Sequence, residues 1–460
     1  MPRDAISRRN WLRASAGAMG LSLPQWLGLR QTQAAGATPG FGKAKSCIVL
    51  YCWGGVSHID TWDPKPDAPA EVRGQFAPIS TATPGIQLGE HMPLIAKLTD
   101  RLAIVRSMHH TSTFHGRGMY WNMTGHPTPN ADQFTNLSPS PTDWPNLGAM
   151  IARLRPAPAE MPAFVQIPYY LVDNKTRQAG DTAGFLGRQY DAVFVRPGRG
   201  KPYGGVSPEL GEMSFQPAEG IDADRFNRRQ ELAAALFSQH RPEATAGVRA
   251  YSAFRQLASD MLGSPKVRGA FDLENEPSPA REAYGDHICG QSALLARRLV
   301  EQGVPAITVV CAAGDLNGAS GDMWDTHGDN FNRLKRDLLP PLERASYALV
   351  NDLAERGLLD QTLIVWLTEF GRTPKVDGGA GRNHYPFCYS VALAGGGIRG
   401  GQVYGRSDRI GAAPLDMPCG PADLHATIFH ALGISPNTRL TDNLGRSVPL
   451  TEGTVLPLFG

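Results

Sequence analysis

The feature that constrains the fold most is an apolar run at residues 46–53 (SCIVLYCW), which ends in Gly54-Gly55. A run without polar alternation is typical of a strand that is buried on both faces of a sheet. Five more runs have this character: 102–106, 163–167, 306–311, 362–368 and 389–394. Helical patterns lie between the runs: 92–98, 147–154, 225–262, 291–302, 331–356 and 422–432. This alternation predicts an α/β fold with a mostly parallel central sheet flanked by helices.

Length and composition fit one large globular domain. The chain has 460 residues, of which 42% are hydrophobic and 19% charged, and these values exclude a disordered or fibrous protein. We expect residues 38–460 to form a single domain. Stretches rich in Gly and Pro at about 126–146, 196–221 and 263–281 are expected to be loop excursions, because predicted strands lie on both sides of them. Pro340-Pro341 should kink or divide the helix predicted at 331–356.

The N-terminus has the pattern of an export signal. Arg8-Arg9 precedes a weakly apolar stretch at 14–29, and small residues follow up to Ala37. Paired arginines, an apolar stretch and a small-residue cleavage site are typical of the twin-arginine (Tat) route. An amphipathic helix with a chance arginine pair is the alternative. We expect residues 1–37 to be removed and the mature protein to be periplasmic or secreted, without a transmembrane anchor, since no later stretch has about 18 apolar residues.

The charge balance argues against nucleic acid as a partner. Residues 1–37 hold five arginines and one aspartate, so the remainder has 40 basic and 42 acidic residues, a net charge of −2. Such a chain has no basic field for nucleic acid or an anionic membrane. A small molecule or a glycan fits better as the partner.

The six cysteines show no CxxC spacing. Export permits disulfides, but several cysteines lie in or beside predicted buried strands, where a free Cys behaves as a small apolar residue. We expect at most one or two disulfides. Because the Tat route carries folded proteins, it also raises the expectation of a metal that is loaded before export.

Histidines, carboxylates and arginines lie next to the predicted strands. Carboxyl ends of parallel strands meet at one edge of the sheet, so these side chains are expected to converge there. Imidazole and carboxylate suit zinc, manganese and similar divalent ions, which assist hydrolysis. The candidate residues are His58, Asp60, His115, Arg117, Asp325, His327, Glu369, Arg372 and His384.

Three of the candidates also have a purely structural interpretation. Asp60 fits a turn, Asp325 fits a helix cap, and Glu369 fits a buried partner of Arg372. No single segment is diagnostic of a metal site. The candidates lie in five separate segments, and their expected convergence at one edge of the sheet favours the metal site over each structural alternative.

Several motifs carry a resemblance to a known family. They cover most of the chain from about residue 46 to 450 and are, in order, GGVSHIDTWDPKP, HHTSTFHGRGMYWNMTGHP, YGDHICGQSALLARRLVEQGVPAITV, WDTHGDN, LTEFGRTP, NHYP and DLHATIFHALGI. With them the chain resembles the Tat-exported DUF1501 proteins of bacteria, a group similar to the sulfatases of the alkaline phosphatase superfamily. The resemblance implies a single large α/β domain with one or two divalent ions. It also implies a nucleophile at a helix start and action on phosphate or sulfate esters.

The resemblance extends to particular residues in the C-terminal half. Asp325 and His327 resemble the Asp/His ligand pair of the superfamily, and His384 resembles its late, lone His ligand. Glu369 stands at the acid of the superfamily's Asp-His pair.

The chain departs from the superfamily pattern at three places. Gly54-Gly55 stands where sulfatases have acidic ligands, so His58 and Asp60 would have to replace them. Phe370 stands in place of the His of the Asp-His pair, and His115 stands at the modifiable Cys or Ser. His115 as nucleophile, His115 as ligand or as base for a water, and attack by Thr111 or Thr113 all remain open.

Two hypotheses follow. The first is an exported metal-dependent hydrolase of phosphate or sulfate esters, with one or two divalent ions; zinc is the preferred ion, and manganese and calcium are alternatives. In it, one ion is held by Asp325, His327 and His384, a second is held or neighboured by His58, Asp60 and Glu369, and the substrate anion faces His115 and Arg117 or Arg372. The second hypothesis is a catalytically degenerate sulfatase-fold protein that binds a glycan or a partner protein.

Overall fold

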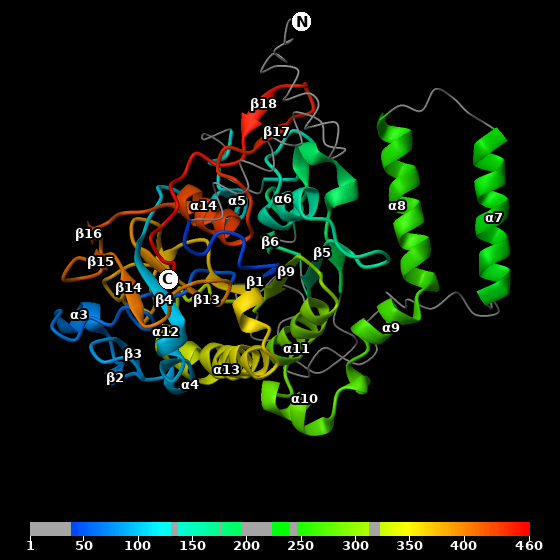
Figure 1. The fold of residues 1–460 in the computed structure, drawn as a ribbon. Helices are drawn as coiled ribbons and strands as arrows, with labels where there is room; N and C mark the ends of the chain where they lie inside the picture. The colour runs from blue at the N-terminus through cyan, green and yellow to red at the C-terminus, as the bar shows by residue number, and fades with distance from the viewer. Residues whose placement is uncertain are drawn as a thin grey trace, which may run out of the picture.

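An eight-stranded sheet forms the centre of the computed structural model, which describes residues 38–129, 137–168, 170–173, 176–195, 223–239, 246–311 and 323–460 (Figure 1). In order across the sheet, the strands are β14 (Gln402–Tyr404), β4 (Leu102–Met108), β13 (Tyr389–Ala394), β10 (Thr362–Leu367), β1 (Ser46–Tyr51), β9 (Ala306–Val310), β5 (Phe164–Ile167) and β8 (Val193–Phe194). β13 runs antiparallel to both of its neighbours, and the other pairs are parallel. The expected mostly parallel sheet is therefore confirmed.

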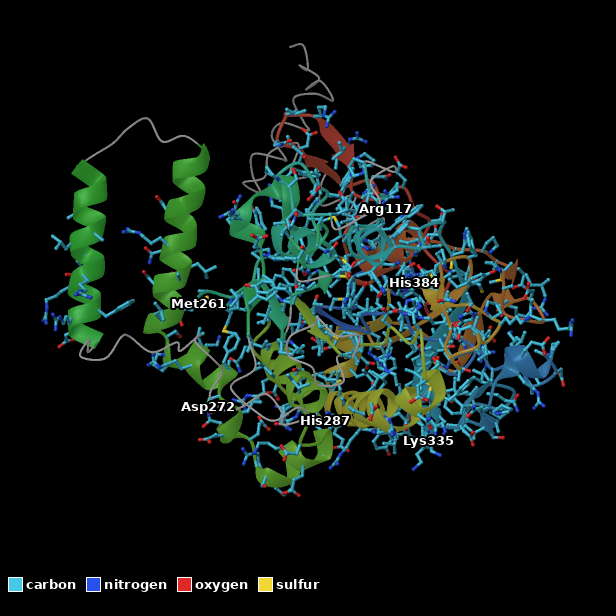
Figure 2. All side chains as sticks on the ribbon, turned by 180° about the vertical axis from the view of Figure 1, so that it is seen from behind. Arg117, Met261, Asp272, His287, Lys335 and His384 are labelled. Carbon is cyan, nitrogen blue, oxygen red and sulfur yellow. The ribbon has the colours of Figure 1, made fainter. Side chains whose placement is uncertain are left out.

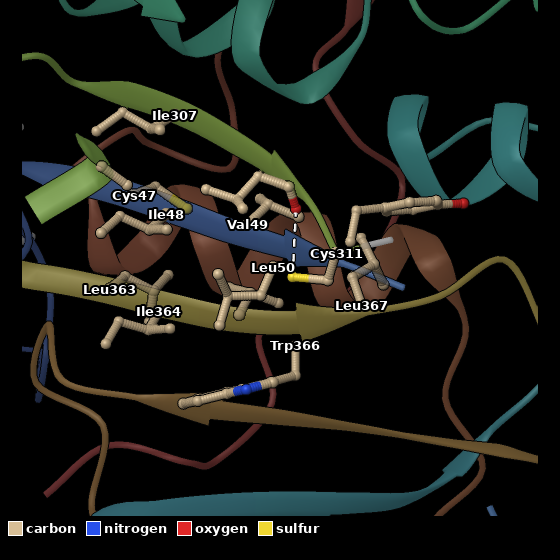
Figure 3. Packing of buried hydrophobic residues seen from close by; sticks show 14 of the residues in the cluster. Cys47, Ile48, Val49, Leu50, Ile307, Cys311, Leu363, Ile364, Trp366 and Leu367 are labelled. Carbon is tan, nitrogen blue, oxygen red and sulfur yellow. Dashed lines mark hydrogen bonds between the residues drawn. The ribbon is translucent and has the colours of Figure 1, made fainter. Parts of the chain in front are cut away.

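The sheet owes its position in the core to continuous apolar strands. All residues of β1, β9 and β10 are buried, and Ile48 of β1 pairs in register with Ile364 of β10 (Figure 3). Burying a Val, Leu or Ile side chain contributes roughly 1.5–3 kcal/mol, so the burial of these strands contributes strongly to the stability of the fold. Their carboxyl ends lie at one edge, where the loops with the candidate site residues begin.

Helices cover both faces of the sheet. In Figure 1, α11 (Ile288–Glu301) and α13 (Leu339–Glu355) lie below the sheet, and α5 (His115–Thr124), α6 (Leu147–Leu154) and α14 (Pro421–Ala431) lie above it. The shorter elements are α3 (Ala70–Arg73), α4 (Pro93–Ala96), β2 (Pro78–Ser80), β3 (Gln87–Gly89), β6 (Val172–Asp173), β7 (Thr176–Arg177), β11 (Gly371–Arg372), β12 (His384–Tyr385), β15 (Arg406–Ser407), β16 (Pro414–Asp416), β17 (Arg439–Thr441) and β18 (Ser447–Pro449).

Three predicted segments differ in detail. The single helix predicted at 225–262 is two helices, α7 (Ala223–Gln239) and α8 (Ala246–Gly263), which stand to one side of the body in Figure 1. The helix predicted at 331–356 is divided into α12 (Asn330–Arg333), a π-helical turn at Leu334–Leu338 and α13. Its division just before Pro340-Pro341 agrees with the loss of backbone donors at proline. The segment 263–281 is not a loop excursion, because α9 (Pro265–Phe271) and the start of α10 (Ser278–Tyr284) lie in it.

Other expectations fall partly or wholly outside the described residues. These are the export signal at 1–37, the excursion at 196–221 and part of the excursion at 126–146. All six cysteines are buried free thiols, so neither of the disulfides that we allowed for is formed. In the part of the chain that the structure describes, no helix combines the length and hydropathy that a membrane span requires.

Candidate metal centre

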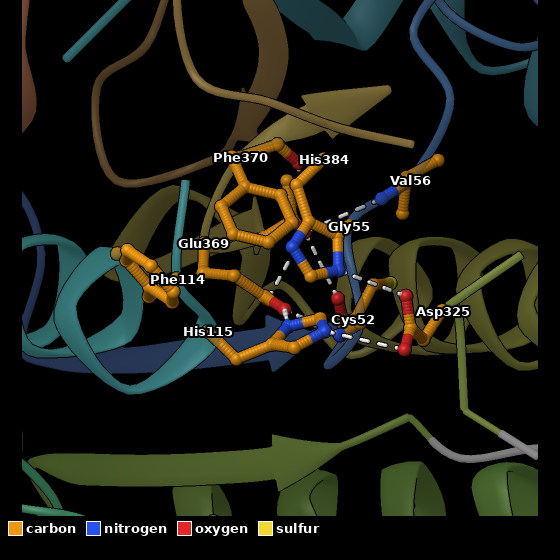
Figure 4. A network of polar contacts seen from close by, with 12 residues as sticks. Cys52, Gly55, Val56, Phe114, His115, Asp325, Glu369, Phe370 and His384 are labelled. Atoms are coloured by element: carbon orange, nitrogen blue, oxygen red, sulfur yellow. Dashed lines mark hydrogen bonds and ion pairs between the residues drawn. The ribbon is translucent and has the colours of Figure 1, made fainter. Parts of the chain in front are cut away.

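Four loops bring the candidate residues together at the carboxyl edge of the sheet. His115 begins α5 shortly after β4, and Asp325 follows β9. Glu369 follows β10 directly, and the chain then returns as the β11–β12 hairpin, in which His384 pairs with Arg372. Figure 4 shows His115, Asp325, Glu369 and His384 side by side.

Three imidazoles meet at the carboxylate of Asp325. One ligand atom each of His115, Asp325 and His384 lie within 4.8 Å of one another. Nε2 of His115 is 3.3 Å from Oδ2 of Asp325, and Nε2 of His384 is 3.2 Å from Oδ1. Nε2 of His327 is 3.1 Å from the same Oδ1 and 2.9 Å from Nε2 of His384. We call these four residues the Asp325 cluster.

The other nitrogen of each imidazole is held by an acceptor. Nδ1 of His384 donates to the carbonyl of Thr113, Nδ1 of His327 to Oδ1 of Asn383, and Nδ1 of His115 to Oε1 of Glu369, each at 2.7 Å. Since a carbonyl or carboxylate oxygen only accepts, we assign the proton of each neutral ring to Nδ1. The three Nε2 lone pairs then face Asp325, which is the arrangement of metal-binding histidines whose outer nitrogen is hydrogen-bonded.

The cluster fits a divalent cation. Two Nε2 lone pairs face each other at 2.9 Å beside a carboxylate, a contact that a cation between them makes favourable. Zinc–ligand bonds of about 2.0–2.1 Å in a tetrahedron place ligand atoms about 3.3 Å apart. The Nε2 atoms of His327 and His384 lie 3.1 and 3.2 Å from Oδ1 of Asp325 and 2.9 Å from each other, and Nε2 of His115 lies 3.3 Å from Oδ2. Three imidazoles and one carboxylate suit zinc, whereas calcium takes oxygen ligands.

Burial and charge oppose each other in the cluster. Burial alone would lower the pKa of His115, but hydrogen bonds and charges of Asp325 and Glu369 outweigh it and raise that pKa to about 9. Burial would raise the pKa of Asp325, but hydrogen bonds from His115 and His384 and the charge of Arg372 hold it far below its usual range. Burial lowers the pKa of His384, although its hydrogen bond to Asp325 acts in the opposite direction.

Glu369 lies behind the cluster rather than in it, which corrects its predicted role as a metal ligand. Its side chain is fully buried, and Oε1 accepts from Nδ1 of His115 and from the backbone N–H of Gly54, both at 2.7 Å. The imidazole of His115 therefore stands between Glu369 and Asp325 (Figure 4). Glu369 orients His115 and balances its charge.

Arg372 does not face a substrate anion, contrary to its predicted role. Its buried guanidinium donates to the carbonyls of Gly54, Gly55 and Arg382, and to Oδ1 of Asp325 at 2.5 Å. These contacts occupy all three guanidinium nitrogens. Arg372 therefore fixes Asp325 and the loop after β1.

His58 and Asp60 do not join the cluster, which corrects their prediction as metal ligands. Both carboxylate oxygens of Asp60 accept from Arg382, at 2.8 and 2.9 Å, and Oδ2 also accepts from Ser57 and Asn330. Nε2 of His58 bonds to the carbonyl of Gly411 at 2.8 Å, and burial lowers the pKa of this imidazole. The first acid of the loop after β1 is therefore saturated by internal donors.

Gly54 explains why acidic ligands are absent at the end of β1. Its φ is +120°, and a Cβ at this position would lie 2.3 Å from the backbone nitrogen of Asp325. Its own N–H donates to Glu369. The loop that carries Asp325 thus occupies the space that a side chain would need.

Three predicted residues, Arg117, Thr111 and Thr113, make no side-chain hydrogen bond to the cluster among the described residues. The guanidinium of Arg117 lies 5.6 Å from the ring centre of Phe114, and its Nε and Nη2 are buried without a hydrogen-bond partner. Figure 2 labels Arg117 and His384 in the same upper part of the body. Thr111 and Thr113 are exposed, and Thr113 serves the cluster only through its carbonyl. The role of Arg117 stays a prediction.

Sequence reasoning missed two groups that position the cluster, namely Asn383 and the carbonyl of Thr113. The place of Asn383 directly before His384 was the available signal. The indole of Trp53 also packs against His115, with ring centres 5.4 Å apart.

Comparisons with known proteins identify the family but not the reaction. No curated protein matches this sequence. Among solved structures, the chain is similar to an alkaline phosphatase superfamily protein from Vibrio parahaemolyticus (11% identity, TM-score 0.38, 86% of this chain and 68% of that one). It is also similar to the PsFucS1 sulfatase from Pseudoalteromonas sp. (12% identity, TM-score 0.36, 88% of this chain and 70% of that one). A third similar structure is the phosphonate monoester hydrolase SpPMH from Silicibacter pomeroyi (12% identity, TM-score 0.34, 90% of this chain and 76% of that one).

The family model described as "Protein of unknown function (DUF1501)" matches residues 44–458. Because the match spans most of its length, the chain belongs to the DUF1501 family.

Proposed function

We propose that this protein is an exported, zinc-dependent hydrolase of phosphate or sulfate esters, with a small anionic ester or a sulfated or phosphorylated glycan as substrate. The observation that carries the proposal is the convergence of three imidazole Nε2 atoms on Asp325 while each Nδ1 is held by an acceptor. Such an arrangement directs Nε2 atoms at a carboxylate, where a cation can bind them.

A bound zinc ion would polarise an ester oxygen and lower the pKa of a water molecule. The residues of the chain supply the rigid frame. Glu369 and the carbonyl of Thr113 fix the ring orientations of His115 and His384. Trp53 and Phe370 pack against His115, with ring centres 5.4 and 5.1 Å away, and exclude water from the inner side. The side chain of His327 is 47% exposed, so a substrate can approach from its side.

Water is the nucleophile that we propose. Both nitrogens of His115 are engaged by carboxylates. In the zinc-bound protein its Nε2 lone pair would be on the ion and its Nδ1 would carry a proton, so neither nitrogen would be free to attack. Thr111 and Thr113 make no hydroxyl contact with the cluster among the described residues.

One observation favours the alternative, a degenerate protein that binds a glycan or a partner without turnover. Both candidate anion-binding groups of the inner site, Arg372 and His115, already contact Asp325. Such a protein would hold its ion as a structural group.

Metal content and turnover, measured together, separate the two functions. Protein purified after export is assayed for bound metal and for hydrolysis of aryl phosphates and aryl sulfates with added Zn, Mn or Ca. The proposal predicts about one ion per chain and turnover that disappears in His327→Ala and His384→Ala. His91→Ala is the matched control, because His91 pairs with Glu90 outside the cluster. Stoichiometric metal without any ester hydrolysis would favour the binding protein.

A further inference from the structure

We propose that Asp377 and Asn383 form a positioning pair that selects the metal-binding tautomer of His327, an inference that rests on the proposed function. Oδ1 of Asn383 accepts from Nδ1 of His327 at 2.7 Å, and Nδ2 of Asn383 donates to Oδ2 of Asp377 at 3.3 Å. A carboxylate only accepts, so Asp377 fixes the amide with its NH₂ group outward and its oxygen toward the imidazole. The proton of His327 then stays on Nδ1, and Nε2 is free to bind an ion.

Asp377 is itself held in place by backbone donors. Its Oδ1 accepts from the N–H groups of Gly379 and Gly381, both at 3.0 Å. The backbone N–H of Asp377 donates to the carbonyl of Gly381 at 3.0 Å. The turn at 377–381 thus aims the other carboxylate oxygen at Asn383.

The same turn is fastened to the loop that carries His327. Asn330 donates to the carbonyl of Ala380 and Arg382 donates to the carbonyl of Thr326, each at 3.0 Å between backbone atoms. A Cβ at Gly381 would lie 1.8 Å from the carbonyl oxygen of His327, so only glycine permits this approach. These contacts join the two loops and hold the amide of Asn383 beside the ring of His327.

His327 needs such a pair more than the other histidines do. Its side chain is 47% exposed, compared with 21% for His384 and 11% for His115. Water competes for Nδ1 of an exposed ring, whereas His384 is fixed by a backbone carbonyl and His115 by the buried Glu369. We therefore expect His327 to be the ligand whose contribution depends most on its outer partner.

The test compares variants by zinc affinity and by the absorption spectrum of the Co²⁺-loaded protein, which reports the number of ligands. Asn383→Leu removes the acceptor at similar volume and should weaken zinc binding about 10- to 100-fold. It should also change the Co²⁺ spectrum. Asp377→Asn frees the amide to turn and should have a smaller effect in the same direction. Asn332→Leu, an exposed Asn that pairs with Asp329, is the matched control.

The double variant Asp377→Asn/Asn383→Asp exchanges the two groups and keeps an acceptor toward His327. It should restore zinc affinity and the Co²⁺ spectrum if the pair acts through the ring. Failure of this rescue in folded protein, or an unchanged affinity and spectrum in Asn383→Leu, would overturn the inference. Absence of metal from the wild-type protein would instead overturn the proposed function, so the two failures are distinguishable.

Discussion

Asp60 and Asp325 lie in two sites at the same edge of the sheet that contain similar residues but differ in how each carboxylate is satisfied. Asp60 is fully buried, and both of its carboxylate oxygens accept hydrogen bonds from the guanidinium of Arg382. Asp325 accepts from Arg372 on one side, but on the other side it faces three imidazoles whose outer nitrogens are already used. The first site is satisfied by the chain itself, and the second is the one that we propose a cation completes.

The comparison teaches that residue type does not identify a ligand. Both loops contain an acid and a histidine after a buried strand, yet only the Asp325 cluster has lone pairs that converge. Whether an acid is a metal ligand depends on whether its partners already donate hydrogen bonds to its carboxylate. The following experiments test this difference, from the largest expected effect to the smallest.

Asp325→Asn should abolish stoichiometric metal binding. The amide oxygen can still accept from Arg372, but the negative charge that the imidazoles share is lost. Metal content of the purified variant, with circular dichroism to verify folding, measures the effect. Full metal occupancy in this variant would mean that Asp325 is not part of the site.

Asp60→Asn should lower the stability of the protein without removing its metal. It leaves the buried guanidinium of Arg382 without its counter-charge, and we expect the free energy of unfolding to fall by about 3–5 kcal/mol. Metal content per folded chain should stay as in the wild type. Denaturant titration and metal analysis check both parts, and selective loss of metal would reverse the assignment of the two sites.

The pH dependence of stability should differ between metal-free and zinc-loaded protein. Folding raises the pKa of His115 from an ordinary 6.5 to about 9, so the folded state binds the proton more tightly than the unfolded state. This contribution, roughly 3 kcal/mol, is complete below pH 6.5 and is lost as the pH rises through about 9. Zinc on Nε2 excludes the proton, so the loaded protein should lack this slope. Identical slopes in both forms would contradict zinc binding at His115.

Glu369→Gln should weaken zinc binding about 10-fold, the low end of the effects of outer partners, because the amide oxygen still accepts from His115. Tyr51→Phe is the control. It removes only a 3.4 Å contact to the other carboxylate oxygen, so it should leave the affinity unchanged. Titration with a competing chelator measures both variants. An equal loss in the two variants would show a general packing defect.

The sequence predicted those features that depend on local pattern. All six apolar runs became strands of the sheet, since uniform burial leaves a continuous apolar signature. α5 was absent from the helical patterns because its residues, HGRGMYWNMT, have two glycines and no clear apolar period. The boundary between α7 and α8 was also missed, although Pro242 lies in the sequence between the two helices.

In the candidate site, the sequence predicted which loops meet but not the pairing within them. Asp325, His327 and His384 were placed together because strand ends meet at one edge and because these residues resemble the ligands of the superfamily. Asp60 was assigned to a metal because its partner Arg382 is 322 residues away and leaves no local signal. The distinction between Glu369 as ligand and as partner depends on which ring nitrogen it meets, and only the structure has this geometry.

Anomalous diffraction at the zinc absorption edge, from crystals grown with zinc, tests the central claim most directly. The account predicts one strong peak within about 2.0–2.2 Å of Nε2 of His115, His327 and His384 and of the Asp325 carboxylate. A peak bound by Asp60 or His58, or a zinc-saturated crystal with none between the three imidazoles, would contradict it.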